Sequence, residues 1–184
     1  MADDFRSLLA ATFAPYQALS EIQLDALHAH YELLCKWNKK LNLWRVKDIR
    51  EAVELHYCES LYLARTLPPG SLRVVDVGSG AGFPGFPIAI LRSQCEVDLL
   101  ESDQRKAAFL REACHGHSNL RVVASRAEEC TTKRYDWIVS RAVRAEAVEG
   151  LPLAANCALL TSSPSPVKIP WGESRFIRMF HVEL

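Results

Sequence analysis

The glycine-rich segment Asp76-Val-Gly-Ser-Gly-Ala-Gly-Phe-Pro-Gly85 carries the clearest chemical signal in the sequence. Glycines at this density let a backbone turn sharply and approach a ligand closely. Counted from Gly78, the sixth position is Phe83, so the segment lacks the G-x-G-x-x-G pattern of dinucleotide-binding loops. No lysine follows in the register of a P-loop, which excludes a triphosphate cradle of that kind. The candidate ligand-binding residues of this loop are Asp76, Gly78, Gly80, Gly82 and Phe83.

Two acids complete a site of nucleoside shape. Glu101 lies close to the roughly 20-residue offset expected for a carboxylate that binds ribose hydroxyls. Glu128, in Ser125-Arg-Ala-Glu128, is expected near an adenine edge. A carboxylate on the ribose, with no basic residue inside the loop, suits an adenosine that carries no phosphates. S-adenosylmethionine is such a ligand, and the alternative is a structural turn with incidental acids.

The predicted secondary structure that must position these residues changes after residue 66, from helices alone to alternating strands and helices. Before it, apolar residues recur at helical spacing, and Ser20 with Gln23 predicts a capping box at the start of a helix. A further helix is predicted from about Asp48 to Arg65, with His56 near one of its faces. The breakers Pro68-Pro69-Gly70 then end the helical region.

Strand and helix patterns alternate after that break, which indicates βαβ units on a parallel sheet. Short runs rich in β-branched and apolar residues predict strands, and Thr161–Pro166 reads as a loop. The predicted strands are 72–77, 97–100, 120–124, 135–139, 158–160 and a closing strand within 175–184. The predicted helices between them are 84–92, 103–115 and 144–155.

The charge is balanced in total and uneven along the chain. Lysine plus arginine and aspartate plus glutamate both number 22 among 184 residues, which by itself disfavours a dedicated nucleic-acid binder. However, residues 1–35 hold five acids and one base, whereas residues 36–50 hold six bases and one acid. Basic side chains near Trp37 and Trp44 suit RNA, although a solvated helix face with two core tryptophans would look the same. The candidate RNA-binding residues are Lys39, Lys40, Arg45, Arg105, Lys106 and Arg126.

Several other classes of protein are disfavoured. No stretch approaches the roughly 18 apolar residues of a membrane span, and the acidic N-terminus has the wrong sign for a signal or transit peptide. The six cysteines form no C-x-x-C pair, so reduced thiols and a cytoplasmic location are expected. His115 and His117 lack a third ligand at sensible spacing, so no metal is expected. His56, beside Glu54 and Glu59, reads as a satisfied structural residue.

The sequence resembles the ribosomal RNA small subunit methyltransferase G family, also called glucose-inhibited division protein B. The similarity covers about residues 30–145 in consistent order, and the extended glycine loop is specific to that family. The matching segments are Trp37-Asn38, Asn42-Leu43, His56 with Ser60-Leu61, residues 76–85, Glu101-Ser102, Arg105-Lys106, Phe109-Leu110, residues 125–129 and Ser140-Arg-Ala142. Beyond residue 158 the chain departs from the family's Gly-rich turn and Lys-Gly element.

This resemblance implies roles for particular residues. It implies that Gly78 and Phe83 line the S-adenosylmethionine site, and that Ala127 and Glu128 contact the adenine side. It implies that Arg141 stands near the methyl donor and the target base. It also implies methyl transfer to N7 of a guanine in 16S rRNA, in the loop near the decoding centre.

The residues after the fourth predicted strand agree with that acceptor. Ser140-Arg141-Ala142-Val143 lacks the D/N-P-P-Y/F element of enzymes that methylate exocyclic amines, and no cysteine lies in a Pro-Cys loop. Guanine N7 carries a lone pair and no proton, so its methylation needs positioning and charge stabilisation but no general base. Arg141 could donate to guanine O6, or could instead pair with a neighbouring acid or an RNA phosphate.

The sequence thus predicts an α/β fold: a class I, Rossmann-like, S-adenosylmethionine-dependent methyltransferase sheet with a helical N-terminal extension. The extension is expected over residues 1–66 and the methyltransferase domain over residues 67–184. The expected function is methylation of a guanine N7 in 16S rRNA or the 30S subunit by a bacterial cytoplasmic monomer, with Arg141 as the catalytic residue. The alternatives are a small-molecule methyltransferase and a non-catalytic RNA-binding or ribosome assembly factor.

Overall fold

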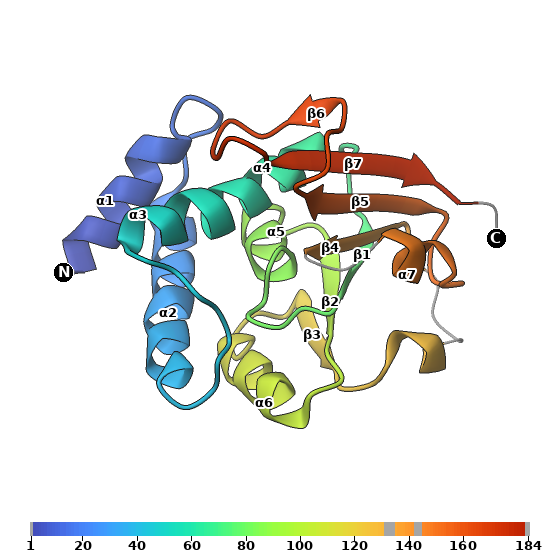
Figure 1. Ribbon diagram of the computed structural model, residues 1–184. Helices are drawn as coiled ribbons and strands as arrows, with labels where there is room; N and C mark the ends of the chain where they lie inside the picture. The colour runs from blue at the N-terminus through green and yellow to red at the C-terminus, as the bar shows by residue number, and fades with distance from the viewer. Residues whose placement is uncertain (1, 131–134, 142–144, 183–184) are drawn as a thin grey trace.

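A computed structural model of the chain describes residues 2–130, 135–141 and 145–182, and Figure 1 shows its arrangement. The N-terminal helices lie on the left of that view, and most strands of a single mixed sheet lie to their right. The helices are α1 (Ala2–Phe13), α2 (Glu21–Asn38), α3 (Ile49–Ala52), α4 (Glu59–Thr66), α5 (Gly85–Leu91), α6 (Gln104–Ala113) and α7 (Ala145–Glu149). The strands are β1 (Arg73–Val77), β2 (Glu96–Leu100), β3 (Leu120–Val123), β4 (Trp137–Arg141), β5 (Asn156–Thr161), β6 (Val167–Lys168) and β7 (Phe176–His181).

The sheet has the order β3-β2-β1-β4-β5-β7-β6. The five strands from β3 to β5 are parallel, and β7 pairs antiparallel with both β5 and β6. β1 lies at the centre, where the strand order reverses direction along the chain, and ligands of open α/β sheets bind at such a point. In the register of the sheet, Asp76 lies opposite Leu99 on one side and Val139 on the other.

Each face of the sheet carries its own hydrophobic core. Because side chains of a strand alternate between faces, Val74 joins the core beneath α1–α6, while Val75 joins the core on the opposite face. The first core unites the N-terminal helices with the sheet, and the second contains residues that follow α7, such as Leu151 and Leu153. The helical layer is therefore packed directly against the strands that carry the glycine loop.

The predicted capping box is confirmed. The Ser20 hydroxyl accepts a hydrogen bond from the Gln23 backbone N–H at 3.3 Å, and the Gln23 side chain accepts one from the Ser20 N–H at 2.9 Å. The same Gln23 amide lies 3.4 Å from the carbonyl oxygens of Ile90 and Leu91, at the end of α5. One residue therefore both starts α2 and joins it to the helix that follows the glycine loop.

The helix predicted from about residue 48 to 65 is not a regular α-helix. Between α3 and α4 it contains a π-helical turn, Val53–Cys58, in which the Glu59 N–H bonds to the carbonyl of Glu54, five residues earlier. Single π-helical turns within α-helices are frequent at functional sites. Here the turn precedes Glu59, whose side chain enters the buried centre of the molecule.

Two further expectations need correction. The helix predicted over 144–155 covers only Ala145–Glu149 among the described residues, because Gly150 and Pro152 do not favour its continuation. The strand predicted over 135–139 runs instead from Trp137 to Arg141. The closing strand is confirmed as β7, the loop at 161–166 leads into the unpredicted β6, and Ala142 and Val143 lie outside the described residues.

Candidate active site

The glycine loop follows β1 and is held against the end of β2. The backbone N–H groups of Gly78 and Ser79 both donate to the Leu100 carbonyl, at 2.9 and 3.0 Å. Gly82 has a φ of +89°, and a Cβ there would lie 3.1 Å from the His30 ring. Glycine is therefore required at this position both for backbone conformation and for the close approach of α2.

Glu101 fixes the outer part of the loop. One carboxylate oxygen accepts a hydrogen bond from the Gly80 N–H at 2.9 Å, and the other accepts one from the Asp103 N–H at 2.8 Å. The residue is nearly buried, with 8% of its surface exposed. Each carboxylate oxygen can accept a second hydrogen bond, so Glu101 can hold the loop and still bind hydroxyl groups of a ligand.

A cleft of about 240 Å³ opens above Glu101, along the ends of β1, β2 and β3. It brings together residues from three separate loops, as the sequence predicts for a nucleoside site. Its lining residues are Val77, Gly78, Leu100, Glu101, Ser102, Ser125, Arg126, Ala127 and Glu128. Four predicted cofactor residues (Gly78, Glu101, Ala127 and Glu128) thus share one cleft.

Asp76 and Phe83 take other positions. Asp76 is fully buried beneath the loop, where one carboxylate oxygen accepts a hydrogen bond from the Gly85 N–H at 2.9 Å. Burial raises its pKa to about 7, and its other oxygen has no partner among the described residues. The Phe83 ring packs against Tyr57 and Trp44, with ring centroids 5.0 and 6.0 Å away, and is 4% exposed. The side chains of Asp76 and Phe83 therefore support the loop from below, outside the cleft lining.

His30 is a site residue that the sequence analysis missed. Its Nε2 lies 3.0 Å from the Ala81 carbonyl oxygen in the loop, and its Nδ1 lies 2.7 Å from the Tyr57 hydroxyl. The ring stacks on Phe86 with centroids 4.2 Å apart, and burial lowers its pKa to about 3. Its place on the apolar stripe between Leu27 and Leu34 is the one sequence signal that it faces inward.

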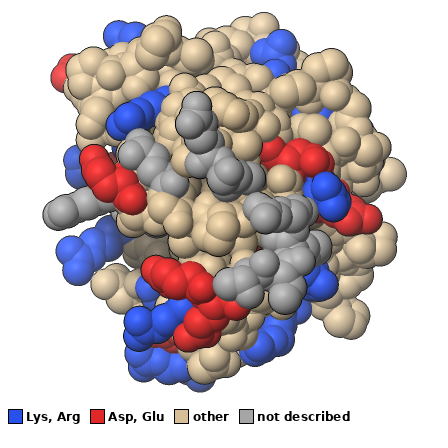
Figure 2. Space-filling view, turned by 90° about the vertical axis from the view of Figure 1, so that its right-hand side faces the viewer, with Lys and Arg blue, Asp and Glu red and all other residues tan. Residues whose placement is uncertain are grey.

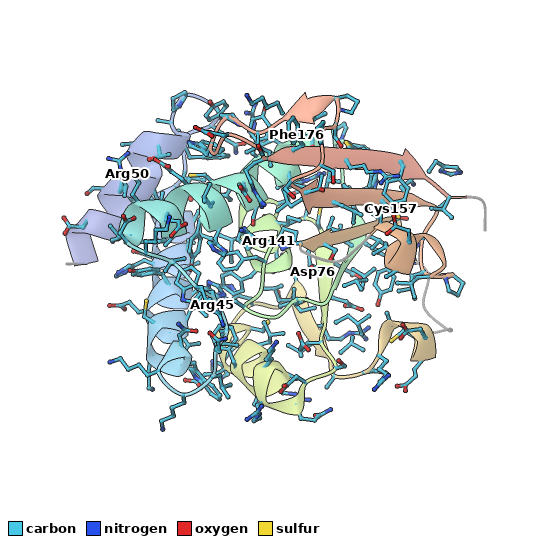
Figure 3. All side chains as sticks on the ribbon, viewed as in Figure 1. Arg45, Arg50, Asp76, Arg141, Cys157 and Phe176 are labelled. Carbon is cyan, nitrogen blue, oxygen red and sulfur yellow. The ribbon has the colours of Figure 1, made fainter. Side chains whose placement is uncertain are left out.

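Arg141 ends β4 on the other side of β1 from the cleft, near the centre of the view in Figure 3. Its guanidinium donates to the Leu55 carbonyl in the π-helical turn and lies 3.2 Å from the Glu59 carboxylate. Glu59 is fully buried and also accepts two hydrogen bonds from Arg175, at 2.6 and 2.7 Å. Arg141 is therefore paired with a neighbouring acid, and Glu59 and Arg175 join the site unpredicted.

Burial lowers the pKa of Arg141 to about 10, so the side chain remains cationic at neutral pH. His56 lies in the π-helical turn, with its ring 5.0 Å from that of Trp44 and 5.1 Å from that of Phe83. Burial, together with the charges of Arg141 and Arg175, lowers the pKa of His56 to about 2. Its Nδ1 is buried without a partner among the described residues, so the expectation of a satisfied histidine is wrong.

Three of the six predicted RNA-binding residues share one hollow, and the other three lie at separate positions. Lys40, Arg105 and Lys106 line one small hollow between the end of α2 and the start of α6, although Asp103 also lines it. Arg45 lines an adjacent hollow on the segment from α2 to α3, where Figure 3 labels it. Lys39 is exposed at the end of α2, and Arg126 lies on the rim of the cleft.

The tryptophans of this basic region are structural. Trp44 is 7% exposed in the core, and Trp37 donates from its ring N–H to Glu112 at 3.0 Å. Trp44 is therefore mainly a core residue, and the RNA-binding prediction for this region depends on its basic side chains. In the face shown in Figure 2, basic side chains are most numerous toward the lower edge and are interspersed with acidic ones.

Within residues 2–130, 135–141 and 145–182, no helix is long and apolar enough to cross a membrane. In the same part of the chain, no group of three histidine, cysteine or acidic side chains is placed to hold a metal ion. Cys35, Cys58, Cys95, Cys114 and Cys130 are free thiols, and Cys95 is fully buried while Cys114 is half-buried.

Comparison with known proteins identifies the family. The family model described as rRNA small subunit methyltransferase G matches residues 23–149, which include the cleft, Glu59 and Arg141. The chain belongs to this family. Curated relatives named ribosomal RNA small subunit methyltransferase G are 42% identical over 151 residues in Rhodospirillum centenum and 40% identical over 126 residues in Neisseria gonorrhoeae. These matches cover 82% and 67% of this chain, and 69% and 60% of the respective relatives.

Membership of the rRNA small subunit methyltransferase G family agrees with the fold. A solved structure from Plasmodium falciparum, assigned as a protein-L-isoaspartate O-methyltransferase in complex with S-adenosyl-L-homocysteine, superposes with a TM-score of 0.50 at 14% identity. It covers 98% of this chain and 95% of that one. The family resemblance and the Rossmann-like methyltransferase fold predicted from the sequence are both confirmed.

Proposed function

We propose that the chain is an S-adenosylmethionine-dependent methyltransferase that acts on N7 of a guanine in 16S rRNA of the small ribosomal subunit. The observation that carries the proposal is the placement of two chemically different sites on either side of β1. An acid-lined cleft lies over β1–β3, and a buried arginine lies at the end of β4. The relatives' name supplies the class of substrate.

The residues of the cleft fit the cofactor. Glu101 and Glu128 offer carboxylate oxygens to the ribose hydroxyls and the adenine edge, and Gly78 leaves room for close approach. The loop from 78 to 83 contains no basic side chain, which suits an adenosine without phosphates. When bound, S-adenosylmethionine would supply an electrophilic methyl group.

The acceptor side needs few groups. Guanine N7 has a lone pair and no proton, so the protein must position the base in line with the methyl group and needs no general base. Arg141 uses one nitrogen for Leu55 and Glu59, which leaves N–H groups to donate to guanine O6. The protein therefore orients the acceptor with a preorganised cation and moves no proton.

The basic residues are assigned to RNA. Lys40, Arg105 and Lys106 share one hollow, and Arg45 lies next to it. Phosphates supply most of the affinity of such surfaces, so these side chains would place the RNA without reading its sequence. The boundary at residues 66 and 67, the monomeric state and the cytoplasmic location remain predictions.

Transfer of a labelled methyl group tests the proposal. The chain is incubated with radiolabelled S-adenosylmethionine and with either 30S subunits or naked 16S rRNA from a strain that lacks the N7 modification. Label is expected on one guanine, and not on 30S subunits that already carry the modification. Cofactor binding without transfer to either RNA substrate would favour a small-molecule methyltransferase. Absence of cofactor binding at millimolar concentration would leave a non-catalytic RNA-binding factor.

A further inference from the structure

A second hollow, larger than the cofactor cleft, lies beyond Arg141 on the acceptor side of the sheet. Its volume is about 430 Å³, and it is bounded by the ends of β4 and β5, the start of α7 and β7. We call it the arginine cavity, because its walls carry Arg141, Arg175 and Arg178. A run of three hydroxyl-bearing residues, Thr161, Ser162 and Ser163, forms another wall.

The charge of the arginine cavity is only partly balanced. Glu59 is the buried counter-ion of both Arg141 and Arg175, so one carboxylate faces two guanidinium groups. Arg178 adds a third positive charge on the wall, and the exposed Glu146 adds one negative charge at the rim. Among the described residues, the three arginines and the two glutamates named here sum to one excess positive charge.

Glu59 accepts hydrogen bonds from both Arg141 and Arg175 and so fixes the orientation of their guanidinium groups. Arg175 uses Nε and Nη2 on the carboxylate, and Arg141 uses Nη1. A guanidinium carries five N–H groups, so each arginine keeps donors beyond those that Glu59 accepts. The Arg141 and Arg175 side chains are 19% and 22% exposed, so this remaining capacity is available at the cavity wall.

This combination matches a phosphate better than a neutral group. Two fixed guanidinium groups bind phosphate oxygens in a planar, bidentate manner, and nearby hydroxyl groups add neutral donors. The cavity lies over β4, β5 and β7 and the cleft lies over β1–β3, so the two hollows adjoin at the neighbouring strands β1 and β4 but share no lining residue. The cavity therefore lies next to the cofactor cleft, on the side of Arg141.

We propose that the arginine cavity binds a backbone phosphate of the RNA substrate next to the nucleotide that receives the methyl group. The inference rests on the proposed function for the identity of the RNA. Arg175 lies outside the segment matched by the family model, so the cavity adds a phosphate-binding element from the C-terminal strands. Arg141 is then shared between the phosphate and the base.

Two substitutions test the cavity without disturbing Glu59. Ser162→Glu places a negative charge on the exposed wall, and Arg178→Gln removes a positive one. The matched controls are Ser165→Glu, in the same loop but outside the cavity lining, and Arg65→Gln, an exposed arginine of α4 on another surface. Circular dichroism melting confirms that each variant is folded.

Filter binding of in vitro transcribed 16S rRNA over a salt series is the first measurement, and calorimetry with S-adenosylmethionine is the second. Ser162→Glu is expected to weaken rRNA binding by about 10-fold, and Arg178→Gln to lower the salt slope by about one. Cofactor affinity stays within about twofold, because the cleft is separate, and both controls bind rRNA as the wild type does. In methyl transfer, KM for the RNA rises more than kcat falls.

Three results have different meanings. Wild-type rRNA affinity and salt slope in both cavity variants would overturn the inference. Weaker cofactor binding with unchanged rRNA binding would also overturn it, because the cavity would then hold the carboxylate of the cofactor. Loss of rRNA affinity in the variants, combined with no methyl transfer by the wild type, would support the cavity and refute the proposed function.

Discussion

The His30 ring donates a hydrogen bond from Nε2 to the carbonyl oxygen of Ala81, at 3.0 Å. A carbonyl can only accept, so Nε2 carries the proton, and the neutral ring then accepts at Nδ1 from the Tyr57 hydroxyl, at 2.7 Å. This chain of bonds joins α2, the π-helical turn and the glycine loop in one buried network. The N-terminal helices therefore hold the loop that forms one wall of the cofactor cleft.

Replacing His30 should loosen that loop. His30→Leu removes the donor to Ala81 and leaves both the carbonyl and the Tyr57 hydroxyl without partners, at a cost of about 2–4 kcal/mol in unfolding free energy. Cofactor affinity should fall by about 10-fold, since the loop must be reordered on binding. Urea denaturation and calorimetry measure the two effects. His30→Gln, whose amide nitrogen can take the place of Nε2, should lose less of both, and His115→Leu at an exposed site should change neither.

His30 also makes stability depend on pH. Its pKa is about 3 in the folded protein and 6.5 in the unfolded chain, so between these values only the unfolded chain binds the proton. The stability that His30 contributes is therefore complete above pH 6.5 and is lost as the pH falls toward 3, at about 1.4 kcal/mol per pH unit. The lowered pKa of His56 likewise makes the protein less stable as the pH falls. The raised pKa of Asp76 has the opposite effect, because between pH 3.8 and 7 the folded protein binds the proton and the unfolded chain does not.

The contribution of His30 to the pH dependence of stability can be measured by comparing the wild type with His30→Gln. Urea unfolding of the wild type and of His30→Gln between pH 4 and pH 6 should give slopes that differ by about 1.4 kcal/mol per pH unit, the wild type being steeper. His56 and Asp76 are present in both proteins, so their contributions cancel. Parallel curves would show that His30 titrates normally in the folded state.

Glu101 offers a sharper test of the cleft. Glu101→Ala removes the acceptor of the Gly80 and Asp103 N–H groups together with the proposed ribose ligand. Loss of one charged hydrogen-bonding group predicts a decrease in S-adenosylmethionine affinity of about 10- to 100-fold. Glu96→Ala, an exposed change at the opposite end of β2, is the control and should bind the cofactor normally in calorimetry. Full affinity in Glu101→Ala would place the cofactor elsewhere.

The sequence predicts what is determined locally. The glycine loop, its neighbouring acids and the strands β1–β5 and β7 all follow from short-range periodicity and turn chemistry, and the cleft follows from where parallel strands end. The Ser20–Gln23 box is likewise a contact three residues apart. These features need no knowledge of long-range packing.

The missed features depend on contacts that are distant along the chain. His30 meets Ala81 51 residues later, and Glu59 meets Arg175 116 residues later. A π-helical turn has no compositional signature of its own, and here its value lies in the Leu55 carbonyl that accepts from Arg141. The inward direction of the Phe83 ring likewise depends on the packing of Trp44 and Tyr57.

Substitution of the buried Glu59 carboxylate should strongly destabilise the fold. Glu59→Gln leaves Arg141 and Arg175 facing one another without a counter-ion, which predicts a loss of about 3–5 kcal/mol in unfolding free energy. Removing Arg175 as well, in Glu59→Gln/Arg175→Gln, should restore part of that loss, and a double-mutant cycle measures the coupling. Glu54→Gln, whose partner Arg50 is largely exposed, should cost less than about 1 kcal/mol. Equal losses of unfolding free energy in Glu54→Gln and Glu59→Gln would refute the role of Glu59 as the shared counter-ion of Arg141 and Arg175.

The basic hollows at the end of α2 predict how the protein holds RNA. Lys40→Glu/Arg45→Glu reverses two exposed charges in neighbouring hollows, so binding to 16S rRNA should weaken by at least 10-fold, and the salt slope should fall by about 2. Methyl transfer to 30S subunits should fall in parallel, while S-adenosylmethionine affinity is retained because the cleft lies elsewhere. Arg65→Glu/Lys168→Glu makes the same change in net charge on other exposed positions and separates a local effect from a global one. If both double variants lose the same affinity, net charge alone governs the association. If neither loses any, the RNA does not contact the end of α2, and the RNA-binding role of Lys40 and Arg45 is refuted.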